Sequence, residues 1–95
     1  MTLADEREKL GGQLNFTDHD DIKADLRAHK DYLAHMAEKS GINVLSGTRV
    51  DRGFAQQMKP DVIVVAAGAV PLIPPIPGIN GPNVMGALDT YYHLE

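Results

Sequence analysis

The apolar positions of the chain follow helical spacing in one region and run continuously in another. The helical face comprises Ile22, Leu26, Tyr32, Leu33, Met36 and Ala37. Their recurrence close to one face of a 3.6-residue repeat predicts an amphipathic helix over residues 20–40. Asp18 or Asp20 is placed to cap its first amides, and Gly41 suits the left-handed residue that ends a helix.

The β-prone segments are short. Residues 1–4 are apolar enough for a strand, and residues 42–45 with residues 48–50 predict one strand that bends at Gly47. Residues 62–66 form an uninterrupted β-branched run, which is typical of a parallel strand covered on both faces. We therefore place this run at the centre of a sheet.

The remaining segments connect these elements. Asp51 can cap a short helix over residues 54–58, which Pro60 ends. Residues 15–21 read as a loop, and the proline-rich residues 70–78 predict a stiff, extended crossover that packs on the domain. The order strand, helix, strand, helix, strand indicates an α/β domain with a parallel sheet.

Composition narrows the possible functions. The chain has 95 residues, 43% of them hydrophobic and 23% charged, which suits one small domain. A net charge of -4 without a basic patch argues against a nucleic-acid partner. The longest apolar run is far shorter than the roughly 20 residues of a membrane span, and the acidic start does not resemble a signal peptide, so a cytoplasmic protein is expected. Because cysteine is absent, any redox chemistry requires a bound cofactor.

Other reactive side chains do not form a catalytic or metal-binding pattern. Asp25, His29 and His35 share a predicted helix, but they lack a further converging ligand, so no metal site is expected. Tyr91 and Tyr92 fit packing better than proton donation. No catalytic residue is assigned.

Several blocks of the chain resemble a known family. LGGQL at residues 10–14 and KPDVIVVAAGAVP at residues 59–71, followed by PIPG at residues 75–78, resemble the FAD-binding domain of the pyridine nucleotide-disulfide oxidoreductase superfamily. Within that superfamily the chain is most similar to the C-terminal part of 2,4-dienoyl-CoA reductase, 2-enoate reductase and trimethylamine dehydrogenase. Residues 78–84 and 87–89 match this NADH:flavin oxidoreductase group too, so the resemblance covers nearly the whole chain.

The resemblance implies cofactor contacts within residues 5–13. Asp5 stands where the family has an acid that binds the adenosine ribose, although it also belongs to a charged, solvated run. Gly11 and Gly12 would let the backbone pass close to the cofactor phosphates, with Gln13 and Lys9 beside them. Taken alone, the glycine pair is equally an ordinary turn.

Two later positions complete the implied site. Val50 matches the position whose backbone holds the adenine ring, or is a plain strand residue. The turn after residues 62–66 borders the cofactor crevice in the family, which commonly has Ala-Thr-Gly where this chain has Ala-Ala-Gly. The cofactor-binding residues implied are Asp5, Lys9, Gly11, Gly12, Gln13, Val50, Ala67 and Gly68.

The chain departs from the family by lacking a Gly-x-Gly-x-x-Gly loop, which normally grips the cofactor pyrophosphate. The strand before that loop normally lies between the next strand and the one at residues 62–66. We therefore expect residues 1–95 to form a single partial Rossmann-like FAD/NAD(P)-binding domain, with a three-stranded, mainly parallel sheet and one long and one short helix. Residues 94–95 resemble an expression-tag scar and are set aside. Weak or undetectable FAD binding is expected for the chain alone.

The resemblance also implies a parent reaction that acts on CH–CH bonds. Such enzymes pass a hydride from NAD(P)H to FAD, and electrons then reach FMN through an iron–sulfur cluster held outside this segment. This chain would hold the ADP half of FAD, with the remainder of the flavoenzyme as its partner. Two alternatives stay open: a non-catalytic α/β scaffold or interaction module, and a segment of a thioredoxin-reductase-like or NADH-oxidase-like flavoenzyme.

Overall fold

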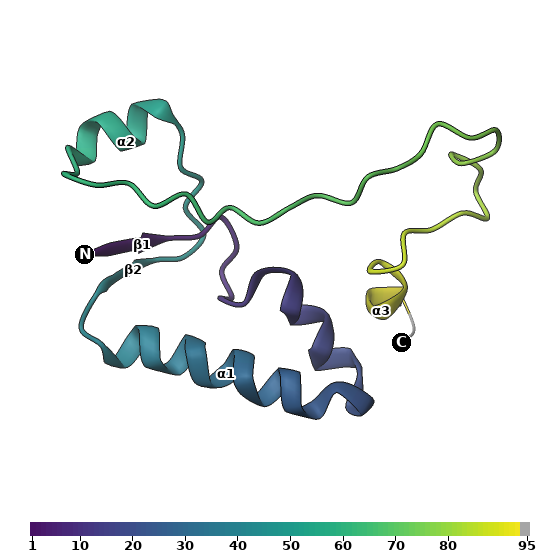
Figure 1. Cartoon of the computed structure of the whole chain (residues 1–95), viewed down its shortest axis with the longest axis horizontal. Coiled ribbons are helices and arrows are strands. Elements are labelled where there is room, and N and C mark those ends of the chain that lie inside the picture. The colour runs from purple at the N-terminus through teal and green to yellow at the C-terminus, as the bar shows by residue number, and fades with distance from the viewer. Residues whose placement is uncertain (94–95) are drawn as a thin grey trace.

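The computed structural model describes residues 1–93 as a small parallel strand pair flanked by helices, with a long extended arm (Figure 1). Strand β1 (Thr2–Ala4) pairs in parallel with β2 (Asn43–Leu45), and Leu3 lies opposite Val44. Because parallel strands require a crossover, the intervening chain forms the long helix on one side of the pair. The mixed α/β class with a parallel sheet is therefore confirmed.

The helical elements are the 3₁₀ helices η1 (Gly12–His19) and η2 (Asp21–Lys23) and the α-helices α1 (Ala24–Lys39), α2 (Arg52–Met58) and α3 (Thr90–His93). The predicted long helix is confirmed as α1, with η2 as a tighter first turn. The Oδ1 atom of Asp20 accepts a 3.0 Å hydrogen bond from the Ile22 amide, so this aspartate caps η2.

The predicted short helix is α2, and its cap is the predicted one. The side chain of Asp51 accepts a 2.8 Å hydrogen bond from the Phe54 amide. This bond satisfies an amide that a free helix end leaves unpaired, and α2 starts at the next residue. The helix ends at Met58, and its C-cap residue Lys59 has a φ of 46° before Pro60.

Residues 15–21 were predicted as a loop, and this prediction is wrong for most of the segment. They lie mainly in η1, where the Thr17 hydroxyl donates a 2.7 Å hydrogen bond to the Leu14 carbonyl. Thr17 is fully buried, because η1 packs against α1. Tertiary packing therefore stabilises a turn structure that local propensity does not predict.

The largest difference concerns residues 62–66, the expected central strand. They are extended but unpaired, and the described sheet has two strands where three were predicted. Val62, Val64 and Val65 are 78%, 83% and 84% exposed. In Figure 1 the segment runs past β1 on the side away from β2, and residues 61–73 make no backbone–backbone hydrogen bond within the described chain. A buried parallel strand needs a ladder on both sides, and no such neighbour is present among residues 1–93.

Burial is low throughout the described chain. Within residues 1–93 no apolar residue is buried, whereas Asn15, Thr17 and Lys30 are. The apolar face predicted for α1 is half exposed, with Leu26 at 45% and Leu33 at 51%. The radius of gyration is 16.7 Å, against roughly 12 Å for a compact domain of this length. The interior is therefore a polar junction between η1 and α1.

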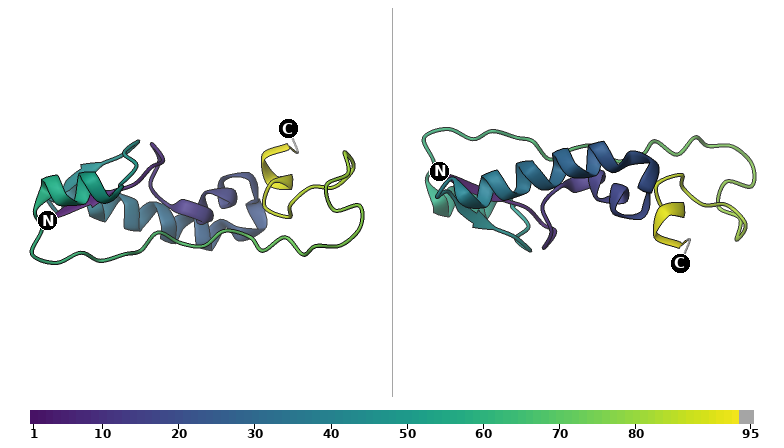
Figure 2. Two further views of the ribbon diagram at one scale, coloured as in Figure 1. Left: turned by 90° about the horizontal axis from the view of Figure 1, so that it is seen from above. Right: turned by 90° about the horizontal axis from the view of Figure 1, so that it is seen from below.

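The extended arm returns to this junction at its far end. Its proline-rich part is exposed, so the predicted packed crossover is wrong for the described chain. The rings of Phe16 and Tyr91 lie 4.9 Å apart and those of His19 and Tyr92 lie 5.1 Å apart. Figure 2 shows α3 beside the start of α1 in both views. The packing role predicted for Tyr91 and Tyr92 agrees with these contacts.

Across residues 1–93, no helix combines the length and apolarity needed to cross a membrane.

Candidate functional site

The candidate site begins where β1 ends. The Asp5 amide donates to the Leu45 carbonyl at 3.1 Å, and the Thr48 amide donates to the Asp5 carbonyl at 2.8 Å. Asp5 is half-buried, and its Oδ1 atom accepts a 2.9 Å hydrogen bond from the Arg7 amide. A carboxylate has a second acceptor oxygen, so Asp5 can still accept from a hydroxyl at the carboxyl end of the strand pair.

The two glycines of the next turn have different surroundings. Gly11 has a φ of 123°, and a Cβ placed there would lie 2.5 Å from Asn15 Oδ1 and 2.9 Å from Lys30 Cδ. Gly12 has a φ of 55°, and a Cβ there would meet nothing within 4 Å. Gly11 is therefore required by internal packing, whereas the backbone of Gly12 is open to a ligand.

The Arg7 side chain binds the Gly11–Gly12 turn, a contact that was not predicted from the sequence. Its Nη1 atom donates a 3.0 Å hydrogen bond to the Gly12 carbonyl. The bond fixes the Gly12 peptide and places a cation at this turn. Arg7 stands in a charged run that is typical of solvated surface. Its separation of five residues from Gly12 is therefore the one sequence feature consistent with this contact.

The Gly11–Gly12 turn also contacts the second predicted turn. The side-chain amide of Gln13 donates a hydrogen bond to the carbonyl of Ala69, which follows Ala67 and Gly68. Gly68 has a φ of 75°, and a Cβ there would meet nothing within 4 Å. The structure thus brings together two blocks that are far apart in sequence, and both offer uncrowded backbone.

An ionic cluster of Asp18, Lys9 and Lys30, of which only Lys30 is buried, lies beside the first turn. The Asp18 carboxylate binds two ammonium groups, Lys9 Nζ at 2.5 Å from Oδ2 and Lys30 Nζ at Oδ1. These hydrogen bonds, Lys30 first and Lys9 second, lower the pKa of Asp18 to about 2. Burial acts to lower the pKa of Lys30, but its hydrogen bonds to Asp18 and Asp31 outweigh burial and raise that pKa.

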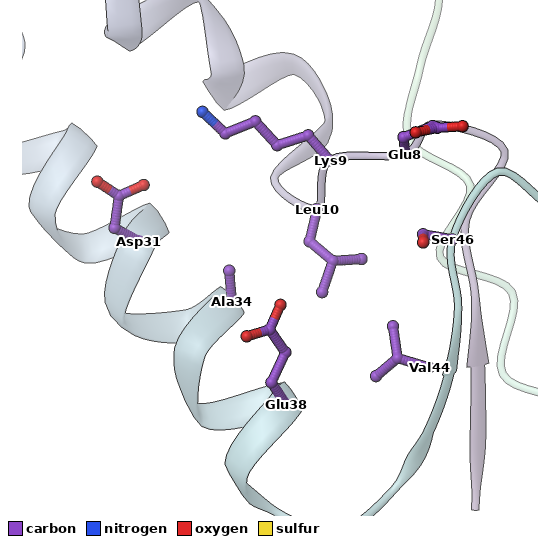
Figure 3. Close-up of a pocket in the computed structure, with 8 residues that line it drawn as sticks. All are labelled: Glu8, Lys9, Leu10, Asp31, Ala34, Glu38, Val44 and Ser46. Atoms are coloured by element: carbon purple, nitrogen blue, oxygen red, sulfur yellow. The ribbon is translucent and has the colours of Figure 1, made fainter.

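A cavity of about 300 Å³ lies between α1 and β2 (Figure 3). Its lining residues are Glu8, Lys9, Leu10, Asp31, Ala34, Glu38, Val44 and Ser46. In Figure 3 the Leu10 side chain points into the space between Ala34 of α1 and Val44 of β2, and Glu38 reaches inward from α1. Of the predicted cofactor residues, only Lys9 lines this cavity, so it is separate from the Gly12 surface.

No described hydrogen bond joins Val50 to the other predicted cofactor-binding residues. It is 50% exposed and lies between β2 and the cap of α2. In residues 1–93 no three histidine or acidic side chains gather as a metal site would require.

The geometry defines a mixed α/β segment in which a carboxylate, cations and open glycine backbone surround the carboxyl ends of two parallel strands. Groups of this kind suit a ligand with hydroxyls and phosphates. The relationships indicated by sequence comparison are to oxidoreductases.

Two curated proteins illustrate this relationship. The chain is 30% identical over 95 residues to a bilirubin reductase of Mediterraneibacter gnavus (strain CC55_001C), covering 100% of this chain and 15% of the relative. It is 30% identical over 83 residues to an NADH oxidase of Thermoanaerobacter brockii, covering 87% of this chain and 13% of the relative. The chain thus spans only a small part of the length of both relatives. No family model matches the chain, and no solved structure matches it significantly.

Proposed function

We propose that this chain binds the ADP half of FAD as a segment of an NAD(P)H-dependent flavin oxidoreductase. The observation that carries the proposal is the hydrogen bond from Gln13 to the Ala69 carbonyl, which joins the two candidate cofactor turns. The similarity to a bilirubin reductase and an NADH oxidase supports the same class of parent.

The described residues fit part of the cofactor. Asp5 would accept from the adenosine ribose, Gly12 would face the diphosphate, and Lys9 would supply a positive charge to it. The fit rests on the free Asp5 oxygen and on the open space at Gly12. Gly68 would border the other side of the crevice.

Two further parts of a dinucleotide-binding site, a glycine-rich phosphate loop and its preceding strand, are absent from the described residues. The sequence has no Gly-x-Gly-x-x-Gly loop, and residues 62–66 have no ladder partner within residues 1–93. We place one further strand and its glycine-rich loop beside these residues, supplied by the remainder of a longer flavoenzyme. The resulting sheet would have the Rossmann-like parallel arrangement expected from the sequence.

When bound, FAD supplies the electron chemistry. This chain's residues would bind and orient it: Asp5 fixes the sugar, and Arg7 keeps the Gly12 peptide in position through its carbonyl. No side chain of this segment is given a catalytic role.

Within the class, we favour the 2,4-dienoyl-CoA reductase and 2-enoate reductase type, on the blocks at residues 10–14 and 59–71. The match to the NADH oxidase of Thermoanaerobacter brockii favours the NADH-oxidase-like alternative. Assaying an intact parent protein with NADH and either an enoate or dioxygen separates these two types.

Titration with FAD and ADP tests the proposal. The chain alone is compared with a fusion that adds a designed strand and a Gly-x-Gly-x-x-Gly loop before residue 1. We expect the fusion to retain flavin absorbance after gel filtration and the chain alone to bind weakly. Asp5→Ala should weaken binding by the fusion, whereas Asp61→Ala, at an exposed position with the same charge change, should not.

A non-catalytic scaffold or interaction module remains the second candidate. The exposed, unpaired segment at residues 61–73 favours it, since free backbone groups and apolar side chains suit strand addition by a protein partner. If neither the chain nor the fusion responds to FAD or ADP, the cofactor proposal fails and this candidate takes its place.

A further inference from the structure

Asp18 is shared by two lysines whose surroundings are unlike. Lys9 Nζ lies 2.5 Å from Asp18 Oδ2, and its side chain is 62% exposed. Lys30 Nζ binds Asp18 Oδ1, and its side chain is 1% exposed. One ammonium group is therefore free to leave the carboxylate for a ligand in solution, whereas the other is enclosed.

Lys30 is fixed in place by its neighbours. Its Nζ atom also lies 3.2 Å from Asp31 Oδ1, and its aliphatic stem contacts the Gly11 position. An ion pair with an enclosed ammonium is harder to separate than one with an exposed ammonium, so the Lys30–Asp18 contact is the more persistent of the two, and Asp31 still pairs with Lys30 when Asp18 is replaced. The Asp18 side chain is 27% exposed, which leaves its outer oxygen and Lys9 accessible from solvent.

We propose that Asp18 is an internal counter-ion that competes with the diphosphate of a nucleotide for Lys9, and that Lys30 tunes this competition by neutralising Asp18. The inference rests on the proposed function, because it concerns the phosphate end of the same site. Neither Asp18 nor Lys30 was among the cofactor-binding residues that the family resemblance implied.

The physical basis is a comparison of anions. A diphosphate carries more charge than a carboxylate and offers more acceptor oxygens, so it can take Lys9 from Asp18. Once Lys9 turns away, Asp18 keeps its bond to Lys30 and does not face the diphosphate as an uncompensated charge. Lys30 therefore acts on ligand affinity through Asp18 without contacting the ligand.

Binding of inorganic pyrophosphate to the chain, followed by NMR shifts of the amides around Gly12, tests the inference. Asp18→Asn removes the competitor and should tighten pyrophosphate binding roughly two- to fivefold, the range expected from a partly exposed ion pair. Asp21→Asn is the matched control. Its carboxylate pairs with Arg27 at 3.3 Å, so it makes the same charge change without touching Lys9.

Three further variants separate competition from general loss of structure. Lys30→Met should weaken pyrophosphate binding, because Asp18 then holds Lys9 alone. The double variant Asp18→Asn/Lys30→Met should regain the affinity of Asp18→Asn and also removes the unpaired carboxylate if the single lysine variant folds poorly. Lys9→Met should lose the response to Asp18→Asn.

Adenosine and ADP identify the ligand chemistry. The inference is supported if Asp18→Asn tightens ADP and pyrophosphate alike and leaves adenosine unchanged. It is overturned if Asp18→Asn behaves like Asp21→Asn, if adenosine responds equally, or if neither the chain nor Asp18→Asn binds pyrophosphate. A positive pyrophosphate result with no FAD binding by the fusion would contradict the proposed function and leave this inference standing.

Discussion

Gln13 and Ala69 are 56 residues apart along the chain and are joined by a hydrogen bond from the Gln13 side-chain amide to the Ala69 carbonyl. Residues 61–73 make no backbone–backbone hydrogen bond within the described chain. The Gln13 side chain is therefore the hydrogen-bonded link between the two candidate turns.

Loss of this side chain should loosen the second turn. In Gln13→Ala the amides of residues 67–70 are expected to show lower ¹⁵N order parameters, because their carbonyl anchor is gone. Gln56→Ala is the control, since that glutamine in α2 is exposed and lies outside both candidate turns. Unchanged order parameters in Gln13→Ala would mean that something other than this hydrogen bond positions the turn.

Alanine at Gly11 should destabilise the junction between η1 and α1. The new Cβ would lie 2.5 Å from Asn15 Oδ1 at a φ of 123°, and strain of this kind costs about 1–3 kcal/mol. Gly41→Ala is the matched control, with a φ of 77° and nothing within 4 Å of a Cβ. Its expected cost is about 1 kcal/mol, from backbone strain alone.

Urea unfolding followed by far-ultraviolet circular dichroism measures both glycine variants. Equal costs for Gly11→Ala and Gly41→Ala would show that the contact with Asn15 and Lys30 relaxes without penalty.

Local signals in the sequence predicted the helices well. Periodic apolar residues located α1, and Asp51 located α2 through its hydrogen bond to the Phe54 amide. Both signals act over a few residues, so they operate whether or not the domain is complete. The η1 segment has no such signal and depends on packing against α1.

Residues 62–66 were predicted as a central strand, but they are unpaired in the structure. Their β-branched composition favours a strand that has a neighbour on each side and is covered on both faces. Residues 1–93 do not provide those neighbours or that cover. For the candidate site, Asp5 and Gly12 were named through the family resemblance of residues 5–14 and not from local chemistry alone. Arg7, Asp18 and Lys30 could not be named, because charged side chains in helices and charged runs usually read as solvated surface.

Stability should fall at both ends of the pH range through the ionic cluster. The pKa of Asp18 is lowered from 3.8 to about 2, so its stabilising contribution is complete above about pH 4 and is lost as the pH falls toward 2. The pKa of Lys30 is raised above 10.5, so its contribution is present below that value and is lost as the pH rises through the higher folded value.

Urea midpoints across this range measure the effect. After allowance for solvent screening, we expect Asp18 to contribute on the order of 1 kcal/mol. Asp18→Asn should flatten the acid limb between pH 4 and 2, whereas Asp25→Asn should leave it unchanged. An acid limb that persists unaltered in Asp18→Asn would rule out this carboxylate as its source.

Substitution within residues 62–66 should have little effect on the chain alone, because its side chains are already in water. Val64 is 83% exposed, so Val64→Thr should change the free energy of unfolding by less than about 0.5 kcal/mol. Val44→Thr makes the same chemical change at a half-buried position in β2 and should cost about 1 kcal/mol. In the fusion that adds a strand and glycine loop, Val64→Thr should cost more than Val44→Thr, since Val64 would then lie in a strand that is paired on both sides and buried on both faces.

Hydrogen exchange gives an independent measurement of the same segment. The amides of residues 62–66 should exchange at their intrinsic rates in the chain alone and become protected in the fusion. A large cost for Val64→Thr in the chain alone, together with protected amides, would mean that these residues already form a strand without the added segment.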